Sequence, residues 1–376
     1  MKVMVAEPPS LPLPKSMAGP GLLAIVLVWK YADHLPLNRQ ERIFRRHGFK
    51  LARSTLCGFV EGAAGLLALI VEAMWEESRK TAAIILTDGT GVLILDKEKC
   101  RRGTFYVFID VGRHVIFRYL KTNDGASVAE ELKGYCGVLQ SDASSVYHEL
   151  QRREPGIIEA GCWSHGRRGL FDALTTDRER ALIGIGFISK LYDAHRDALG
   201  PDGVVDAVKR KTLAQPVLDD LQKWVRQERP LVEKGTVIEV ALGYLDRQWV
   251  PLTRFLEDGR IRLDNNPSEL ELRHEAVGRK NWLFCATDNG AEWNAVVVSL
   301  IASCRMHDIE PWAYLRDVLT LLPGWSQTQV LELAPSNWRA TLARPETQRL
   351  LAGLSLLGRD AALHAANTTA PMASST

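Results

Sequence analysis

The sequence predicts an α/β protein: a mixed sheet that contains a large helical insertion and is flanked by helices on both sides. Apolar residues recur at helical spacing up to about residue 78. Near residue 82 the pattern changes to strand-like runs of β-branched and aromatic residues. The stretch from about 165 to 257 then carries no strand signal, and residues 291–345 are helical again.

Length and composition fit a folded protein of two or three domains. The chain has 376 residues, of which 46% are hydrophobic and 24% charged, which is ordinary for a globular protein. No segment reads as long and apolar enough to span a bilayer, and no signal peptide is recognisable. Six cysteines lack the spacing of a disulfide framework, so we expect a reduced, cytoplasmic compartment and no membrane partner.

The N-terminal part is expected to begin with a flexible arm, residues 1–20, rich in Pro, Ser and Leu. Residues 21–78 are expected to be helical. Within them one helix ends at Gly48 and a second begins near Leu51. Two short helices around a glycine turn are typical of a helix-turn-helix, whose second helix can enter a DNA major groove. Such a hairpin can also simply pack against the rest of the protein.

The charge distribution favours DNA contact in the same region. The net charge is only +2, yet residues 30–60 contain seven Lys or Arg and two acids. This excess suits a phosphate-facing surface, although a solvated helix face explains it equally well. We predict phosphate contacts by the arginines and base contacts by the start of the second helix; the residues are Arg45, Arg46, Arg53, Ser54 and Thr55.

The central region, residues 79–290, is expected to hold the sheet. Three hairpin-like strands come first and are followed by helix, strand, helix and strand, the order of a ribonuclease H-like fold. The expected strands are 83–88 with 92–95, 104–111, 114–120, 137–142 and 156–163. The expected helices are 127–135 and 144–152. The helical stretch 165–257 would then be an insertion, and residues 346–376 a partly disordered tail.

Three acids fall where a metal-dependent nuclease needs them. Asp88 lies at or near the end of the first expected strand, Asp142 ends the fourth, and Glu269 lies on a later helix. Carboxylates on such rigid elements can hold two Mg²⁺ or Mn²⁺ ions about 4 Å apart, which is the arrangement that phosphodiester cleavage uses. Each acid alone is weak support, because strand-end Asp residues commonly cap helices or turns.

Glu269 has two structural alternatives. Asn266 as N-cap, Pro267 at the first helical position and Glu269 at the third would form a variant capping box. Glu269 and Arg273 could also form an ordinary pair on the helix surface. Glu271 would point to the opposite face and is the poorer candidate ligand.

Cys162 and His165 form a Cys-x-x-His motif. A zinc site would need about two further ligands, and although Cys136 and His148 are available, their spacing does not suggest one. A Cys-His nucleophilic dyad is also poorly supported. The motif therefore favours a packing or site-ordering role.

The most specific stretch is the run LDNNPSELELR at 263–273, followed by GRKNW at 278–282. It closely resembles the C-terminal catalytic motif of transposases of the insertion sequence 66 family. Further matching stretches lie at 18–24, 30–41 and 161–168, and the resemblance covers the chain from about Pro9 to about Trp338.

This resemblance implies a ribonuclease H-like DDE transposase that cleaves and joins DNA with two Mg²⁺ or Mn²⁺ ions held by Asp88, Asp142 and Glu269. It implies element ends and target DNA as partners, a homo-oligomer on DNA, a nucleoid-associated location in the cytoplasm, and accessory proteins of the element as further candidates. The residues expected to support the site are Cys162, His165, Arg168, Asn266, Arg273, Arg279 and Lys280.

The chain departs from the family pattern beside each acid. Gly89-Thr90-Gly91 follows the first acid where Glu-Thr-Pro is usual, Ala143-Ser144 replaces Gly-Tyr after the second, and Leu270 replaces an Arg after the third. The family's coiled-coil-like helix and zinc-binding cysteine module are also not found. An alternative expectation is therefore a truncated, inactive DNA-binding remnant that modulates transposition.

Overall fold

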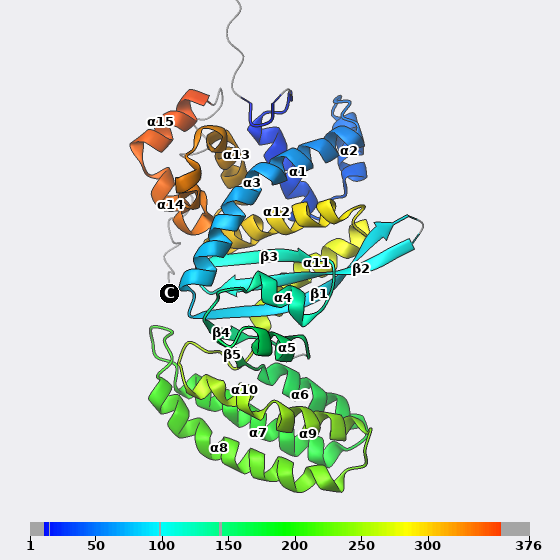
Figure 1. The fold of residues 1–376 in the computed structure, drawn as a ribbon, viewed down its shortest axis with the longest axis vertical. Coiled ribbons are helices and arrows are strands. Elements are labelled where there is room, and N and C mark those ends of the chain that lie inside the picture. The colour runs from blue at the N-terminus through cyan, green and yellow to red at the C-terminus, as the bar shows by residue number, and fades with distance from the viewer. Residues whose placement is uncertain (1–10, 15, 98, 143–144, 355–376) are drawn as a thin grey trace, which may run out of the picture.

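The computed structural model describes residues 11–14, 16–97, 99–142 and 145–354. Most of the predicted arm, residues 1–10 and 15, and residues 355–376 of the predicted tail lie outside this description. A central sheet separates two helical regions (Figure 1). The N- and C-terminal helices lie on one side of it and the inserted helices on the other.

Three helices precede the sheet: α1 (Pro20–Tyr31), α2 (Leu37–Arg46) and α3 (Arg53–Thr81). The chain turns after α2 at Gly48, whose φ of 86° favours glycine. The second helix of the predicted helix-turn-helix is not short, because α3 has 29 residues and ten of them are buried. The expectation of two short helices is therefore wrong, and one face of α3 belongs to the core.

The expectation that no segment is long and apolar enough to span a bilayer also needs correction. Helix α3 meets that criterion by length and composition. Its apolar face is occupied, however: Leu67, Ile70 and Trp75 are at most 2% exposed, and the helix packs against α12 (Asp288–Met306) and the sheet. A core helix accounts for its composition.

The sheet is mixed, with the order β3-β2-β1-β4-β5. Strand β1 (Ile84–Asp96) pairs antiparallel with β2 (Lys99–Asp110), and β2 pairs antiparallel with β3 (His114–Leu120). On the other side of β1, β4 (Gly137–Gln140) and β5 (Ile157–Ala160) run parallel to it. The connecting helices are α4 (Gly125–Glu131) and α5 (Ser145–Arg153).

The two strands expected at 83–88 and 92–95 are a single strand, so Asp88 lies inside β1 and not at its end. Asp88 is paired with Val107, and Gly89 with Tyr106. A Cβ on Gly89 would come within 3.1 Å of the Tyr106 ring. Gly89 therefore keeps the strand paired past a bulky neighbour, between the two separate strands that the sequence suggested.

Helix α12 covers the edge strand β3. The Ser299 hydroxyl accepts the Phe117 N–H at 2.8 Å, and the Ser303 hydroxyl accepts the Val115 N–H at 3.0 Å. These buried bonds satisfy backbone groups that an edge strand would otherwise leave unpaired.

The segment that follows β5 and extends to about residue 265 is helical, as its sequence predicts. It has its own hydrophobic core. Its helices are α6 (Trp163–Asp172), η1 (Ala173–Thr175), α7 (Arg178–Asp197), α8 (Ala207–Glu228), η2 (Arg229–Leu231), α9 (Val237–Arg247), α10 (Trp249–Thr253) and η3 (Arg254–Leu256). Helix α11 (Asn266–Trp282) then returns to the sheet and packs on β1 and β2.

The C-terminal region continues after α12 with α13 (Pro311–Leu321), η4 (Leu322–Gly324), η5 (Gln327–Leu333), α14 (Pro335–Leu342) and α15 (Pro345–Leu354). Residues 345–354 are therefore helical, where the sequence placed the beginning of a tail.

Candidate metal centre

The sheet register places Asp88 and Asp142 at the same level of neighbouring strands. Leu86 of β1 is the partner of Gln140 of β4 in a parallel pair. Asp88 lies two residues after Leu86, and Asp142 lies two residues after Gln140. Both acids therefore come to the same end of this strand pair. Both carboxylates lie in partly buried positions.

Glu269 reaches the same place because the start of α11 is bonded to β1. The buried amide of Asn265 donates through Nδ2 to the carbonyl oxygen of Thr87 at 2.7 Å, directly before Asp88. Its Oδ1 accepts the Ser268 hydroxyl at 2.9 Å. Glu269 is the next residue, in the first turn of the helix. A buried amide thus connects the helix that carries one acid to the strand that carries another.

The capping box proposed for Glu269 is wrong. Helix α11 begins at Asn266, one residue earlier than expected, with Asn265 as its N-cap and no side-chain cap bond. The side-chain amide of the actual N-cap residue, Asn265, is bonded to β1 instead.

Asp88 lies near enough to the other two acids for their charges to affect its ionisation. The pKa of Asp88 is raised to about 7, first by burial and then by the negative charges of Asp142 and Glu269. The Gly89 N–H, at 2.7 Å from Oδ1, and the charge of Arg168 oppose this rise. Carboxylates that repel one another in this way suit a divalent cation, which would relieve the repulsion with oxygen ligands.

The ion-pair partners of Glu269 come from α6. Within the described chain its carboxylate pairs with Arg168, whose guanidinium lies 3.4 Å from Oε2, and faces His165, whose Nε2 lies 3.8 Å from Oε1. Arg273 lies exposed one turn further along α11 and takes no part in these pairs, so the proposed Glu269–Arg273 pair is wrong. Glu271 is bound to Arg305 at 2.7 Å, as its opposite face predicts.

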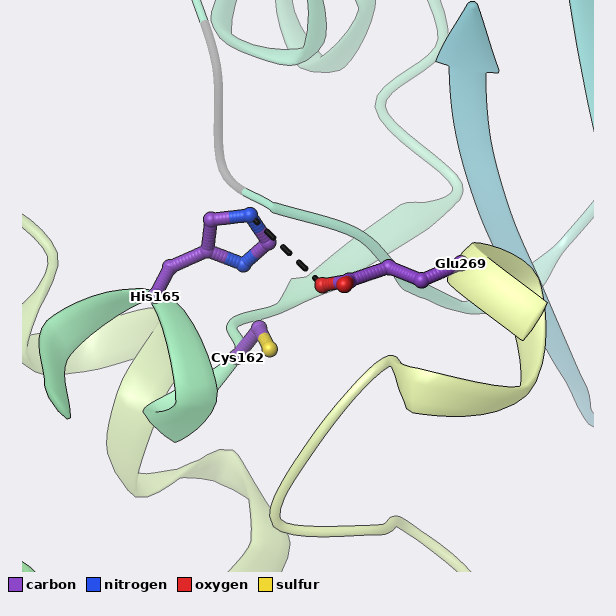
Figure 2. A group of neighbouring side chains, drawn as sticks. All are labelled: Cys162, His165 and Glu269. Carbon is purple, nitrogen blue, oxygen red and sulfur yellow. Dashed lines mark ion pairs between the residues drawn. The ribbon is translucent and has the colours of Figure 1, made fainter. Parts of the chain in front are cut away.

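Cys162 and Asn266 also lie beside the acids. The buried Cys162 Sγ accepts the Asn265 N–H at 3.2 Å, and Asn266 Oδ1 accepts the Ser164 hydroxyl at 3.1 Å. Figure 2 shows Cys162, His165 and Glu269 projecting toward one another from the start of α6 and from α11. One donor atom from each of the three lies within 4.8 Å of the others.

Arg279 and Lys280 do not reach the acids. They lie in the last turn of α11, about 15 Å along the helix axis from Glu269 at the usual rise per residue. The neighbouring Asn281 accepts a hydrogen bond from Arg39 of α2 at 3.1 Å. The second half of the motif therefore contacts the N-terminal helices, and direct support of the acids by these two cations needs correction.

The residues predicted to contact DNA are solvent-exposed at the end of α2 and the start of α3; they are Arg45, Arg46, Arg53, Ser54 and Thr55. Arg45 forms an ion pair with Glu41 at 3.2 Å. The opposite face of α2 packs inward, with Gln40 buried and Phe44 against Trp29. The hairpin therefore packs on the protein and also presents a basic edge.

A fourth acid, which was not predicted from the sequence, lies on the strand next to β4. Glu159 of β5 is 6% exposed, and burial together with the charge of Asp142 raises its pKa to about 7. The signal was a lone acid in an otherwise apolar strand. Tyr244 of α9 was not predicted either; its hydroxyl donates to the Asp142 carbonyl oxygen at 3.2 Å.

Comparison with known proteins shows the family to which this sequence is similar. Residues 15–293 match the model of the Transposase IS66 family, and residues 299–336 match that of the IS66 C-terminal element. Among curated relatives, uncharacterized protein y4hP of Sinorhizobium fredii (strain NBRC 101917 / NGR234) is 29% identical, covering 88% of this chain and 64% of the relative. Uncharacterized protein y4qI of the same strain is 28% identical, covering 85% and 62% respectively. The chain thus spans less than two thirds of the length of these two relatives.

Proposed function

Because this chain belongs to the IS66 transposase family, we propose that it cleaves DNA at the ends of an insertion sequence and joins those ends to target DNA. The placement of three acids inside the matched region carries this proposal: Asp88 and Asp142 come to the same end of paired strands, and Glu269 lies in the first turn of the helix that is bonded to β1. The sheet order β3-β2-β1-β4-β5 with α11 beside β1 supports a ribonuclease H-like core.

Asp88, Asp142 and Glu269 would hold two Mg²⁺ or Mn²⁺ ions. Such ions, when bound, activate the attacking oxygen and stabilise the leaving one in phosphodiester cleavage and transfer. The protein's own contribution is rigid placement: two acids on paired strands and the third on a helix tied to β1 through Asn265. Arg168, 60% exposed beside Glu269, is positioned to meet a DNA phosphate at the edge of the centre.

The exposed basic edge formed by α2 and the start of α3 would bind DNA away from the acids. DNA is thus the proposed partner, at both the element ends and the target. We further propose that the protein acts as a homo-oligomer on DNA, together with accessory proteins of the element, in the cytoplasm and associated with the nucleoid. Membership of the family is the ground for these three proposals.

A metal-dependent nicking assay on terminal inverted-repeat DNA tests this function. We expect cleavage that requires Mg²⁺ or Mn²⁺ and is lost in Asp142→Asn, because one carboxylate of the centre is neutralised. Asp220→Asn removes an exposed acid of α8 and serves as the matched control with unchanged cleavage. Nicking that persists in Asp142→Asn at the parent rate would refute the assignment.

The alternative is a DNA-binding remnant without catalysis. It is favoured by the surroundings of Glu269, where Leu270 is an apolar side chain 54% exposed at the position where the family usually has an Arg. The same assay separates the two functions, because retained binding with no nicking under any divalent metal would favour the remnant.

A further inference from the structure

The cluster formed by Cys162, His165 and Glu269 is more than support for the acids. Its three side chains come from two segments distant in the sequence, the start of α6 and the first turn of α11. They offer sulfur, nitrogen and oxygen donors within 4.8 Å of one another. Tetrahedral zinc coordination places such donors roughly 3.5 Å apart, so small side-chain rotations would complete a three-ligand set.

Two of the three side chains, His165 and Glu269, each have a buried polar atom without a hydrogen bond among the described residues. Glu269 Oε1 and His165 Nδ1 are both buried and have no hydrogen-bond partner in the described chain. The closest approach of His165 Nε2 to Oε1 is 3.8 Å, which is too long for a hydrogen bond. Buried polar atoms without partners are costly, and a shared cation would satisfy both side chains.

One backbone donor is placed to stabilise a metal-bound sulfur. Burial raises the pKa of the Cys162 thiol to about 11, and the Asn265 N–H, 3.2 Å from Sγ, opposes this rise. Donors of this kind stabilise the negative charge of a ligating sulfur. Arg168 occupies Glu269 Oε2 at 3.4 Å and leaves Oε1 free to face the cluster. Ser164 and Asn266 join the two segments through a 3.1 Å hydrogen bond, which fixes the ligands' relative position.

We propose that Cys162, His165 and Glu269 form a binding site for one Zn²⁺-like ion, separate from the oxygen-ligand centre but sharing the Glu269 carboxylate with it. Sulfur and imidazole donors select zinc over magnesium. Three protein ligands leave a fourth position for water or a substrate oxygen. The shared carboxylate connects the two centres, so zinc at this site fixes the orientation of an acid that the proposed function uses.

This inference shares Glu269 with the proposed function but does not depend on DNA cleavage. The test is zinc and cobalt binding to the full-length chain in which the exposed Cys57, Cys100 and Cys136 are replaced by serine to remove adventitious thiols. We expect one zinc per chain and, with Co²⁺, a thiolate charge-transfer band. Asp88→Asn, which damages only the oxygen-ligand centre, should leave both signals unchanged.

Ligand substitutions decide whether the metal binds here. Cys162→Ser should abolish the cobalt–thiolate band, and His165→Ala and Glu269→Gln should each weaken zinc binding at least about tenfold. Cys304→Ser, at a buried cysteine outside the cluster, is the matched control and should retain binding. Circular dichroism of the metal-free proteins checks folding; if Cys162→Ser unfolds, the His165 and Glu269 variants carry the test.

The opposite results overturn the proposal. They are absence of stoichiometric zinc in the parent protein, or unchanged binding in His165→Ala and Glu269→Gln. A failure of the proposed function has a different pattern: zinc binding to this cluster remains, while Asp142→Asn leaves nicking unaffected or the parent does not nick at all.

Discussion

At the scale of single residues, a buried amide connects the segments that carry the candidate metal ligands. Asn265 is fully buried and connects the Thr87 carbonyl, the Ser268 hydroxyl and the Cys162 sulfur through its side chain and its N–H. Asn265→Ala would leave the Thr87 carbonyl without this donor, and a buried unsatisfied group costs about 1–3 kcal/mol. We expect a loss of unfolding free energy in that range, measured by urea denaturation.

The neighbouring Asn266 provides the control for this prediction. It is exposed, so Asn266→Ala should change the unfolding free energy by no more than about 0.5 kcal/mol. Equal effects of the two substitutions would mean that the bond to Thr87 does not position α11.

A second residue-scale prediction concerns pH. Burial raises the pKa of Glu275 to about 7, although a hydrogen bond from Asn294 at 3.0 Å and the charge of Lys30 oppose the rise. Its usual value is 4.5, so between these pH values the folded state binds more protons than the unfolded state. Stability from this group is therefore lost as pH rises from about 4.5 to about 7.

Glu275→Gln cannot ionise and should remove this loss. At about 1.4 kcal/mol per pKa unit, the variant should be more stable than the parent by roughly 3 kcal/mol at pH 8 and about equally stable at pH 4.5. Urea denaturation at both pH values measures the difference. A variant that follows the parent's pH dependence throughout would show that Glu275 is not the titrating group.

The residue scale also shows what sequence could and could not predict. Asp88, Asp142 and Glu269 were predicted as a set because a specific motif and the order of elements point to them, and their role stays a prediction. The resemblance also named Cys162 and His165 as supporting residues, but the approach of their donor atoms to Glu269 could not be predicted, because these segments meet only through the fold. The same holds for Asn265, whose partner Thr87 lies on a distant strand.

At the scale of elements, local pattern predicted helix and strand types well and their ends less well. The glycines after Asp88 read as a break because glycine weakens strands. Gly89 instead makes room for the ring of Tyr106 on the neighbouring strand. This neighbour cannot be recognised from the residues next to Gly89 in the sequence. Helix α3 was recognised at its start, but its continuation into the core depends on contacts with α12 and the sheet.

The same element scale carries the DNA-binding prediction. Arg46 and Arg53 are exposed on the facing ends of α2 and α3. If each contacts a phosphate, its replacement by Ala should lower the slope of log affinity against log salt by about 0.9. Fluorescence anisotropy with duplex DNA over a salt series measures this slope.

Arg45→Ala should have a smaller effect on affinity, because Glu41 already pairs with this guanidinium in the free protein. Lys211→Ala, on the exposed surface of α8, is the matched control and should leave the slope unchanged. Unchanged slopes in Arg46→Ala and Arg53→Ala would leave packing as the only role of the hairpin.

At the scale of the whole molecule, the protein has two hydrophobic cores. One joins the sheet to the N- and C-terminal helices, and the other lies among the inserted helices. Hydrogen bonds tie the segment before α11 to the inserted helices: Tyr192 donates to Asp264 at 3.1 Å, and the Trp163 N–H donates to the Leu263 carbonyl at 2.9 Å. The inserted helices therefore position the segment that leads into α11.

Arg210 of α8 holds that segment from within the second core. Its guanidinium is completely buried and donates to the carbonyl oxygens of Phe255, Asp258 and Ile261, the last two at 2.7 and 3.0 Å. Burial lowers its pKa to about 10, so it remains charged at neutral pH. Arg210→Met keeps much of the volume but leaves these carbonyls without their donor.

We expect Arg210→Met to cost about 3 kcal/mol or more, since each unsatisfied buried group costs about 1–3 kcal/mol. Because the two cores are separate, this loss should be local. Native-state hydrogen exchange should show reduced protection of α7, α8 and α9, with β2 and β3 retaining theirs. Lys211→Met, at the exposed neighbouring position, should leave both sets unchanged. An equal fall in protection of the inserted helices and the sheet would instead show that the two cores unfold as one unit.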